Sequence, residues 1–498
     1  MESEGLDRRE LLVRAAAGAA LALLPAGYAR GASSRLTPAA VKRLDAAVRG
    51  AVALPGSPGY DAARRVYQLA GSLPSPLAVV RVRDTADVEA LVRWAAREDV
   101  ALVARSGGHS YIRQSGGSGA VVADLSGMRA VALRRSIGEV EVGGGAQLVD
   151  LAAKLAPAGA LVPSGSCPSV GIGGVTLGGG MGLSGRRLGL TCDRLVAATI
   201  VTADGRRRRV DARSDEDLFW ALRGGGGSFG IVTSLRFSVH RETRGCWASM
   251  SFPWAHADDV LRRWQVLAPT APRALTSILS LSAGGGGPSV HVSAQHLGAE
   301  SELRRLLVPL AGIDGARLAT ASTDLLGLAR RWANCPAGPI AACHTRGTRP
   351  GGVLERAAFA ASSIYLQKPL DAAGRRALLA RVEARGSGSG IVIVDAYGGA
   401  INAVPRAATA FPHRDALASV QILSYHAPAA SAGPRAWVAG TRASLAGHGA
   451  SGAYANYADA ALQDFAAQYW GPNRSRLREV KLAVDPDRRF SFPQAAGM

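Results

Sequence analysis

Two residues with nucleophilic side chains lie in separate glycine-rich stretches of this chain. His109 stands in Arg105-Ser-Gly-Gly-His-Ser-Tyr111, and Cys167 stands in Gly165-Ser-Cys-Pro-Ser-Val-Gly-Ile-Gly-Gly174. The glycines before His109 permit positive φ angles and close approach of the backbone to a ligand. Successive backbone N–H groups in such turns form a nest for an anion. The two stretches together predict a large anionic cofactor that is held by its phosphates and tethered through side chains.

The glycine-rich stretch 171–180 does not by itself identify a nucleotide site. It matches the G-x-G-x-x-G spacing only loosely. The corresponding loop of a dehydrogenase needs a strand before it and an acidic residue about twenty residues later. Pro163 and Pro168 interrupt any such strand, so the pattern disfavours a Rossmann dehydrogenase. An isolated histidine is usually structural, and it is the pairing of His109 with Cys167 that favours a functional role.

The pairing resembles the berberine bridge enzyme-like oxidases, in which a His and a Cys both bond covalently to FAD. Further stretches match the family's motifs in the family's order, over roughly residues 60–496: 124–128, 222–233, 397–399, 411–414, 454–457 and the closing segment 469–481. The resemblance implies that His109 bonds the flavin 8α carbon and that Cys167 bonds C6. It implies FAD as the cofactor and no metal.

The resemblance also implies which residues bind the cofactor. They are His109, Cys167, Arg105, Ser106, Gly107, Gly108, Ser110, Gly165, Val170, Gly171, Gly173, Gly174, Gly230, Ile231, Val232 and Asn456. Val170 falls where the family controls access of oxygen to the flavin, and a valine there leaves room for O₂. Plain packing of the loop is the alternative role for this residue.

Alcohol oxidation needs a base for the hydroxyl proton while hydride leaves carbon. Tyr457 falls where many family members carry that base, although a free tyrosine has a pKa near 10 and needs a neighbour that lowers it. We expect Tyr454 to support it. Gln421 is expected to face the substrate from a strand over 418–424, but a one-residue slip in register would point Val420 inward instead. Tyr111 is a second candidate for the wall of the site.

Two departures from the family bear on the base. Many relatives carry a tyrosine where this chain has Met181, and that tyrosine helps to activate the base. Plant relatives carry a histidine where this chain has Val175. Neither change affects attachment of FAD, but both leave open how Tyr457 is activated.

The net charge of the chain indicates which partners it can bind, and its N-terminal residues indicate its cellular location. The chain of 498 residues has a formal net charge of +20, which favours anionic polymers or substrates. No recognition motif indicates nucleic acid, and no apolar run is long enough to span a membrane.

Arg8-Arg9 before an apolar stretch predicts a twin-arginine-type signal over residues 1–32, and hence an exported or extracellular protein. An uncleaved amphipathic helix is the alternative. The cluster 206–209 follows Asp204-Gly205, which predicts a hairpin turn.

Periodicity predicts the elements that position these residues. Strands are expected over 77–82, 101–104, 121–125, 139–143, 199–203, 230–237, 290–294 and 391–394, and helices over 86–98, 147–155, 300–310 and 371–385. Thr85 is the expected N-cap of the helix 86–98. We predict an FAD-binding domain over 35–245, a substrate-binding domain over 246–450 and a C-terminal return to the FAD-binding domain over 451–498. Cys335 and Cys343 can pair, but the sequence cannot establish it.

The resulting fold class is α+β. It combines a two-lobed FAD-binding domain of the vanillyl-alcohol-oxidase type with a substrate domain whose antiparallel sheet is backed by helices.

The expected function is a secreted oxidase that transfers hydride from an alcohol of a carbohydrate or secondary metabolite to bicovalent FAD, which O₂ reoxidises to give H₂O₂. A dehydrogenase that uses another electron acceptor and an inactive basic glycan-binding protein remain as alternatives. The oligomeric state stays open.

Overall fold

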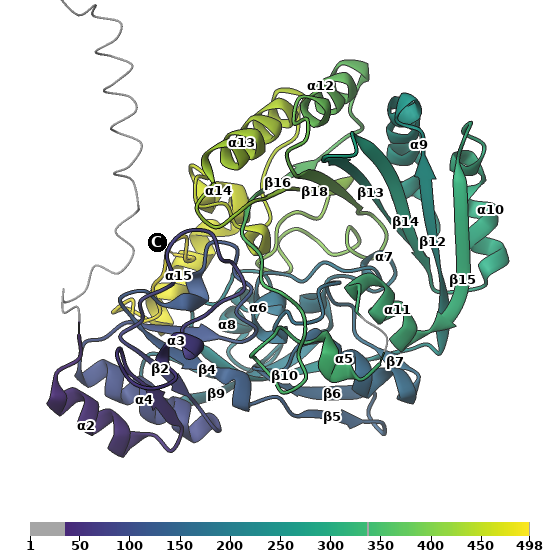
Figure 1. Cartoon of the computed structure of the whole chain (residues 1–498). Helices are drawn as coiled ribbons and strands as arrows, with labels where there is room; N and C mark the ends of the chain where they lie inside the picture. The colour runs from purple at the N-terminus through teal and green to yellow at the C-terminus, as the bar shows by residue number, and fades with distance from the viewer. Residues whose placement is uncertain (1–34, 336–337, 498) are drawn as a thin grey trace, which may run out of the picture.

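The computed structural model describes residues 35–335 and 338–497, so the predicted signal lies outside the described residues. Two lobes face each other across the molecule (Figure 1). The two-sheet lobe contains a four-stranded and a five-stranded sheet together with the C-terminal segment, and the seven-stranded lobe contains one large sheet with its helices. In the described chain, no helix combines the length and apolar character that crossing a bilayer requires.

The four-stranded sheet has the order β1-β2-β4-β3, in which β2, β4 and β3 run parallel. Its elements are α2 (Pro38–Ala47), β1 (Ala51–Ala53), α3 (Tyr60–Ala63), β2 (Ala78–Arg81), α4 (Thr85–Arg97), β3 (Leu102–Arg105) and β4 (Val121–Asp124). The predicted helix 86–98 is α4, and its 3.6-residue apolar stripe is buried against the sheet. Its N-cap is Asp84 rather than Thr85, because the Asp84 carboxylate accepts the N–H of Asp87.

The five-stranded sheet has the order β5-β6-β10-β8-β9. Its strands are β5 (Val131–Arg134), β6 (Glu139–Gly143), β8 (Leu195–Val201), β9 (Arg207–Asp211) and β10 (Ile231–Ser238), and its helices are α5 (Leu148–Leu155), α6 (Ile172–Leu177), α7 (Gly185–Leu188) and α8 (Glu216–Ala221). The arginine cluster lies at the turn from β8 into β9, as the sequence predicts. Helix α6 was not predicted, since its glycine content indicated a loop. A short pair, β7 (Ala160–Leu161) with β11 (His240–Arg241), completes the lobe.

The seven-stranded sheet is antiparallel, in the order β15-β12-β14-β13-β17-β18-β16. Its strands are β12 (Arg244–Phe252), β13 (Leu275–Ala283), β14 (Ser289–His296), β15 (Arg317–Asp324), β16 (Phe359–Leu366), β17 (Gly390–Ala396) and β18 (Ala418–Tyr425). Helices α9 (Ala257–Thr270), α10 (Glu300–Ala311), α12 (Ala372–Glu383) and α13 (Ala432–Gly447) cover its outer face (Figure 1). The predicted sheet backed by helices is therefore confirmed.

Alternation along these strands separates the packed outer face from an inner face that looks toward the two-sheet lobe. Val392, Val394 and Val420 belong to the core beneath the helices. Gln421 pairs with Ile393 of β17, so both side chains lie on the inner face. The register therefore places Gln421, and not Val420, toward the site.

The C-terminal segment returns to the two-sheet lobe. Its elements are η7 (Ala455–Tyr457), α14 (Phe465–Trp470), η8 (Gly471–Asn473) and α15 (Arg474–Val484). Trp470 and Leu477 pack into the same core as the five-stranded sheet. The predicted domain boundaries at residues 245 and 450 stay predictions.

A disulfide and a buried arginine tie parts of the chain together. Helix α11 (Leu325–Ala333) is followed by Cys335, which forms a disulfide with Cys343 at the end of η6 (Ile340–Cys343). The buried guanidinium of Arg186, on α7, donates hydrogen bonds to the backbone carbonyls of five residues in the seven-stranded lobe: Pro269, Ala271, Pro272, Leu275 and Tyr397. Five carbonyls from two separate segments thus converge on one cation of the other lobe.

Candidate active site

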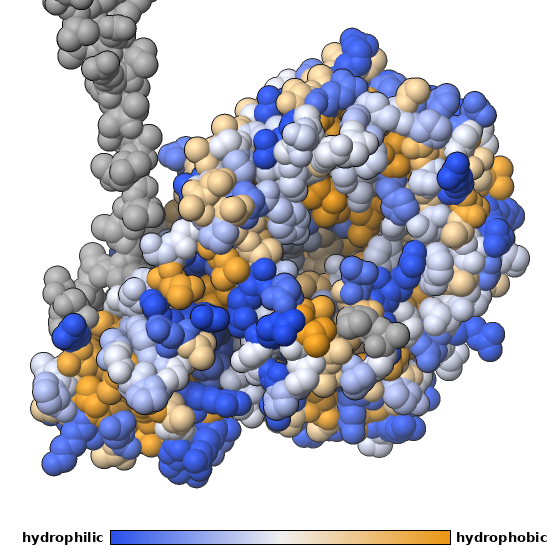
Figure 2. All heavy atoms as spheres, viewed as in Figure 1, coloured by the Kyte–Doolittle hydropathy of each residue, from blue (hydrophilic) through white to orange (hydrophobic). Residues whose placement is uncertain are grey.

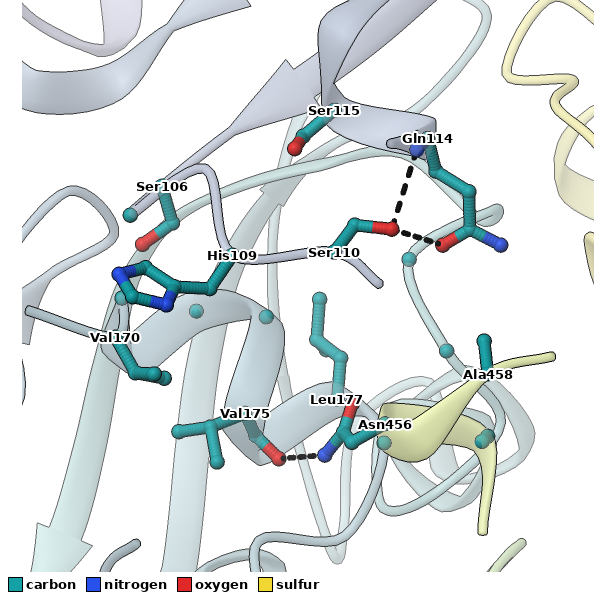
Figure 3. A pocket seen from close by; sticks show the side chains of 18 of the residues that line it. Ser106, His109, Ser110, Gln114, Ser115, Val170, Val175, Leu177, Asn456 and Ala458 are labelled. Carbon is teal, nitrogen blue, oxygen red and sulfur yellow. Dashed lines mark hydrogen bonds between the residues drawn. The ribbon is translucent and has the colours of Figure 1, made fainter. Parts of the chain in front are cut away.

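A cavity of about 330 Å³ lies in the two-sheet lobe and opens toward the seven-stranded sheet. Its lining comes from segments that are distant in sequence: 103–115, 165–181, 225–232, 454–458, 469–470 and 492–496, with Gln421 from β18. Figure 3 shows part of this lining, with His109 above helix α6 and Asn456 beside it. The cavity therefore forms only when both ends of the described chain and the large sheet are in place.

His109 follows strand β3 through a tight turn. Gly108 has φ +73°, and a Cβ on Gly107 would lie 2.2 Å from the Gly171 nitrogen, so both positions require glycine. The imidazole stacks on Tyr67 with ring centroids 4.1 Å apart. Burial, assisted by the charge of Arg356, lowers the pKa of His109 to about 3. The ring is therefore neutral at ordinary pH and keeps a lone pair on one nitrogen.

Cys167 lies next to His109. Its Sγ is 4.0 Å from His109 Nδ1. Burial raises the pKa of the thiol, while hydrogen bonds from the Ser169 side chain and from the backbone of Ser169 and Val170 oppose that rise. The structure thus brings together the two residues that the sequence singled out as tethers.

The cavity provides a cradle that fits a large anionic cofactor such as FAD. Gly174 lines it, and a Cβ there would meet only open space. Ser115 also lines the cavity, and its buried Oγ has no hydrogen-bond partner among the described residues. Buried hydroxyls and unobstructed glycine backbone supply donors for phosphate and ring oxygens.

Fourteen of the predicted cofactor residues line the cavity. These are His109, Cys167, Ser106, Gly107, Gly108, Ser110, Gly165, Val170, Gly171, Gly173, Gly174, Gly230, Val232 and Asn456. Arg105 and Ile231 do not. The Arg105 guanidinium turns away to pair with Asp124 at 2.9 Å, and Ile231 is buried in the core with Val201, because alternation on β10 directs it away from Val232.

A wall of aromatic and amide groups closes one end of the cavity. Gln421 Nε2 donates a hydrogen bond to the hydroxyl of Tyr111. The Tyr111 ring stacks on Tyr457, with centroids 5.6 Å apart and planes 14° apart. All three residues line the cavity. Because Tyr111 and Gln421 come from different lobes, the wall also joins the lobes.

The predicted supporting residue Tyr454 is fully engaged by its neighbours. Its hydroxyl accepts the backbone N–H groups of Gly180 at 2.8 Å and Met181 at 3.1 Å, and Nδ2 of Asn456 at 2.9 Å. Asn456 Nδ2 also donates to the Val175 carbonyl, which Figure 3 shows as a dashed line. This network fixes η7 on the glycine-rich segment and so positions Tyr457.

Asp395 is a candidate proton acceptor that the sequence reasoning missed. It pairs with Ser419 on β18, which places it on the inner face with Gln421, and its Oδ2 is buried with no hydrogen-bond partner among the described residues. Burial raises the pKa of Asp395 to about 7. The alternation Ile391-Val-Ile-Val-Asp395 carried the signal, since the acid is in phase with the isoleucines and out of phase with the core valines.

Tyr457 and Asp395 interact electrostatically. The pKa of Tyr457 lies well above its usual value, chiefly through burial and then through the charge of Asp395. Within the described chain, no residue hydrogen-bonds the Tyr457 hydroxyl, although the side chain lines the cavity. Met181 packs among Tyr454 and its aromatic neighbours and offers Tyr457 no donor. The arrangement can remove a proton from a hydroxyl through the phenol and the carboxylate together.

Comparison with known proteins agrees with this geometry. The FAD binding domain family matches residues 76–211, and the family described as berberine and berberine like matches residues 453–496. The uncharacterized FAD-linked oxidoreductase YvdP of Bacillus subtilis is 32% identical over 453 residues, which cover 90% of this chain and 97% of the relative.

Two oxidases of oligosaccharides are also similar. Chitooligosaccharide oxidase of Gibberella zeae is 30% identical over 463 residues, which cover 88% of this chain and 91% of the relative. The solved structure of xylooligosaccharide oxidase from Myceliophthora thermophila C1 in complex with xylobiose superimposes with a TM-score of 0.83 at 26% identity, over 92% of this chain and 99% of the other. The similarity therefore extends across both lobes.

Proposed function

The chain belongs to the berberine bridge enzyme-like family of FAD-linked oxidoreductases, and from this premise we propose that it oxidises an alcohol group of an oligosaccharide with FAD bonded to both His109 and Cys167. The observation that carries the proposal is the juxtaposition of His109 Nδ1 and Cys167 Sγ, 4.0 Å apart, in a cavity whose far wall holds Tyr457. One tether is a neutral imidazole and the other a thiol, which are the two nucleophiles that such a double attachment requires.

FAD, when bound, supplies the acceptor for the hydride of the carbinol carbon and delivers the electrons to O₂, which gives H₂O₂. The protein handles the proton. Because burial and the charge of Asp395 disfavour a Tyr457 phenolate, we assign Tyr457 as a relay that never holds the negative charge. In this assignment Tyr457 takes the proton of the substrate hydroxyl, and its own proton passes to Asp395 once the two groups come into hydrogen-bond contact, which they do not make without substrate. The pKa of Asp395, about 7, suits it as the acceptor near neutral pH.

The inner face of the seven-stranded sheet supports a carbohydrate as substrate. Ser249, His291, Ser280 and Ser293 lie on this face, and the Ser249 hydroxyl is 3.2 Å from His291 Nε2. Figure 2 shows the surface hollowed between this lobe and the two-sheet lobe. Small hydroxyl groups along a hollow suit the hydroxyls of a chain of sugar units, and the names of two relatives point to the same class.

We also propose that the protein is exported in the folded state. The disulfide between Cys335 and Cys343 supports this location, since disulfides persist outside the reducing cytosol. Immunoblots of culture supernatant and cell fractions, with Arg8→Lys and Arg9→Lys together as the matched variant, test it. Loss of export in the double variant is expected, and equal export of both proteins would contradict a twin-arginine route.

Acid denaturation tests the double attachment. The wild-type protein should retain its visible flavin spectrum in acid and carry the mass of FAD. His109→Ala and Cys167→Ala should each still retain flavin, and the double variant should lose it. A wild-type protein that binds FAD and releases all of it in acid would overturn the covalent part of the proposal.

Turnover tests the reaction. Oligosaccharides of glucose, xylose and N-acetylglucosamine would be screened with a peroxide readout and, in parallel, with a dye as electron acceptor. Peroxide formation at a rate equal to substrate oxidation is expected. Fast dye reduction with slow reoxidation by O₂ would instead select a dehydrogenase.

A further inference from the structure

Ser169 lies at the centre of the tether site. Its side chain is only 1% exposed. Its Oγ is 2.9 Å from His109 Nε2, and it accepts a hydrogen bond of 3.0 Å from the Thr345 hydroxyl. One buried hydroxyl therefore links a proposed tether to a residue from a distant segment.

The contact at Nε2 fixes the orientation of the imidazole. A hydrogen bond at one ring nitrogen of a histidine sets the direction of the other nitrogen. Ser169 Oγ contacts Nε2, and Thr345 donates to the same oxygen and holds it in place. The opposite nitrogen, Nδ1, then faces Cys167, 4.0 Å from its sulfur.

We propose that Ser169, held in place by Thr345, is the positioning residue for flavin attachment: its contact with Nε2 fixes the imidazole of His109 so that Nδ1 faces Cys167 and can bond FAD. This inference rests on the proposed double attachment. Overall, each attachment breaks one N–H or S–H bond of the protein and one C–H bond of FAD and forms one N–C or S–C bond, and O₂ takes the two hydrogens as H₂O₂.

The segment that carries Thr345 is anchored on the two-sheet lobe. His344 Nε2 lies 3.1 Å from Oδ1 of Asp150 on α5, and Arg349 Nη1 lies 2.6 Å from the same oxygen. The disulfide at Cys343 holds the chain immediately before it. Thr345 is 3% exposed, so water does not compete for Ser169. The tether site thus depends on a residue outside both glycine-rich stretches.

The other groups that face His109 and Cys167 do not fix the orientation of the His109 imidazole. Tyr67 stacks on the imidazole face, and Arg356 acts on His109 only through its charge. Tyr111 and Tyr425 interact electrostatically with Cys167 and donate no hydrogen bond to either tether. Among the described residues, Ser169 is the one whose side chain lies within hydrogen-bond distance of His109 Nε2.

Mass spectrometry of purified holoenzyme tests the proposal. Intact mass gives the fraction of chains that carry covalent FAD, and peptide maps give the occupancy at His109 and at Cys167 separately. For Ser169→Ala we expect occupancy at His109 to fall by roughly tenfold or more, because a reacting group displaced by about 1 Å can lose roughly 100-fold in rate. Ser169→Thr, which keeps the hydroxyl, should restore it.

Thr345 provides a second pair of variants that leaves both glycine-rich stretches intact. Thr345→Val should reduce occupancy at His109, and Thr345→Ser should recover it. Ser164→Ala is the matched control, because Ser164 lies in the same segment as Cys167 and is not the residue that contacts His109 Nε2. Total flavin bound before acid treatment should stay at the wild-type value in every variant, and the thermal midpoint of unfolding shows that each variant is folded.

The outcomes separate this inference from the proposed function. A wild-type protein without covalent FAD would refute the double attachment itself. A wild-type protein with both links, together with full occupancy at both residues in Ser169→Ala and Thr345→Val, would overturn the role of Ser169 alone. If Ser169→Ala does not fold, the Thr345 pair decides, and equal occupancy in Thr345→Val and Thr345→Ser overturns the proposal.

Discussion

Tyr457 has a raised pKa and Asp395 has a pKa of about 7, and we propose that the substrate proton passes from the first residue to the second. A phenol alone needs a positive neighbour to act as a base near neutral pH, and Met181 supplies none. In the proposed mechanism a carboxylate with a pKa of about 7 accepts the proton instead, and the phenol transmits it.

Asp395→Asn tests the acceptor. We expect kcat to fall by roughly 100-fold, the contribution of a positioned base. The base must be deprotonated, so wild-type kcat should decline as the pH falls through about 7, and the variant should lose this dependence. Steady-state rates between pH 5 and pH 9, measured with Asp371→Asn as the exposed control at the N-cap of α12, check the prediction.

The same substitution has an opposite effect on stability. Because the pKa of folded Asp395 is raised above that of the unfolded chain, folding favours the protonated acid. Its stabilising contribution is present at acid pH and is lost as the pH rises toward 7. Asp395→Asn should therefore unfold at the same or a higher temperature than wild type at pH 8. A lower midpoint there would indicate a structural role.

The variants Tyr457→Phe and Tyr454→Phe should separate the proposed proton-relay role of Tyr457 from the structural role of Tyr454. Removal of the Tyr457 hydroxyl should lower kcat by roughly 100-fold and leave the thermal midpoint unchanged, because no described residue hydrogen-bonds it. Removal of the Tyr454 hydroxyl leaves three donors without their acceptor and should cost about 2 kcal/mol of unfolding free energy. Equal loss of stability in both variants would contradict this division.

At the scale of elements, helix α7 joins the lobes through two arginines, of which Arg186 is buried and makes more contacts. Arg186→Met should lower the unfolding free energy by about 3 kcal/mol or more, because it leaves buried carbonyls of two segments without a donor. Arg187→Met is the control: that side chain is 32% exposed and donates to one carbonyl, that of Leu297, so its loss should cost about 1 kcal/mol. Urea unfolding curves of the two variants check the difference, and similar losses would refute the special role of Arg186.

Local patterns in the sequence predicted about half of the strands of the described chain and the helices α4, α5, α10 and α12, and they missed the long helices α9 and α13. They failed where packing decides. Helix α6 was predicted as a loop because of its glycines. A Cβ on Gly173 would lie 3.0 Å from the Gly144 carbonyl, so these glycines permit close packing of a helix rather than a loop. Gln421 shows a second limit, since only the pairing with β17 fixes its register.

The sequence predicted the site residues that stand in linear motifs, and it missed two residues that reach the site from distant segments. His109, Cys167 and Tyr457 stand in recognisable stretches. Asp395 and Thr345 do not, because each acquires its role only when the seven-stranded lobe docks on the two-sheet lobe. Arg105 shows the converse: it stands in the motif, but an ion pair with Asp124 directs its side chain away from the cavity.

At the scale of the whole molecule, the net charge of +20 should guide charged substrates. Arg65, Arg105 and Arg356 interact electrostatically near His109, so the positive potential extends to the cavity. We expect kcat/KM for oligosaccharides that contain a uronate to fall by roughly threefold to tenfold between about 0.01 and 0.3 M ionic strength. The neutral analogue of the same length should not respond. Identical salt dependence for both would contradict electrostatic steering.

The return of the C-terminal segment also fixes when the enzyme can mature. Trp470, Phe492 and Ala496 line the cavity, although its two tethers are translated more than three hundred residues earlier. A ribosome-bound chain still lacks one wall of its cofactor site, and a chain that stops early never completes it. Flavin capture in this cavity should therefore be confined to polypeptides that include the C-terminal segment, and the yellow colour of bound flavin would report synthesis through that segment.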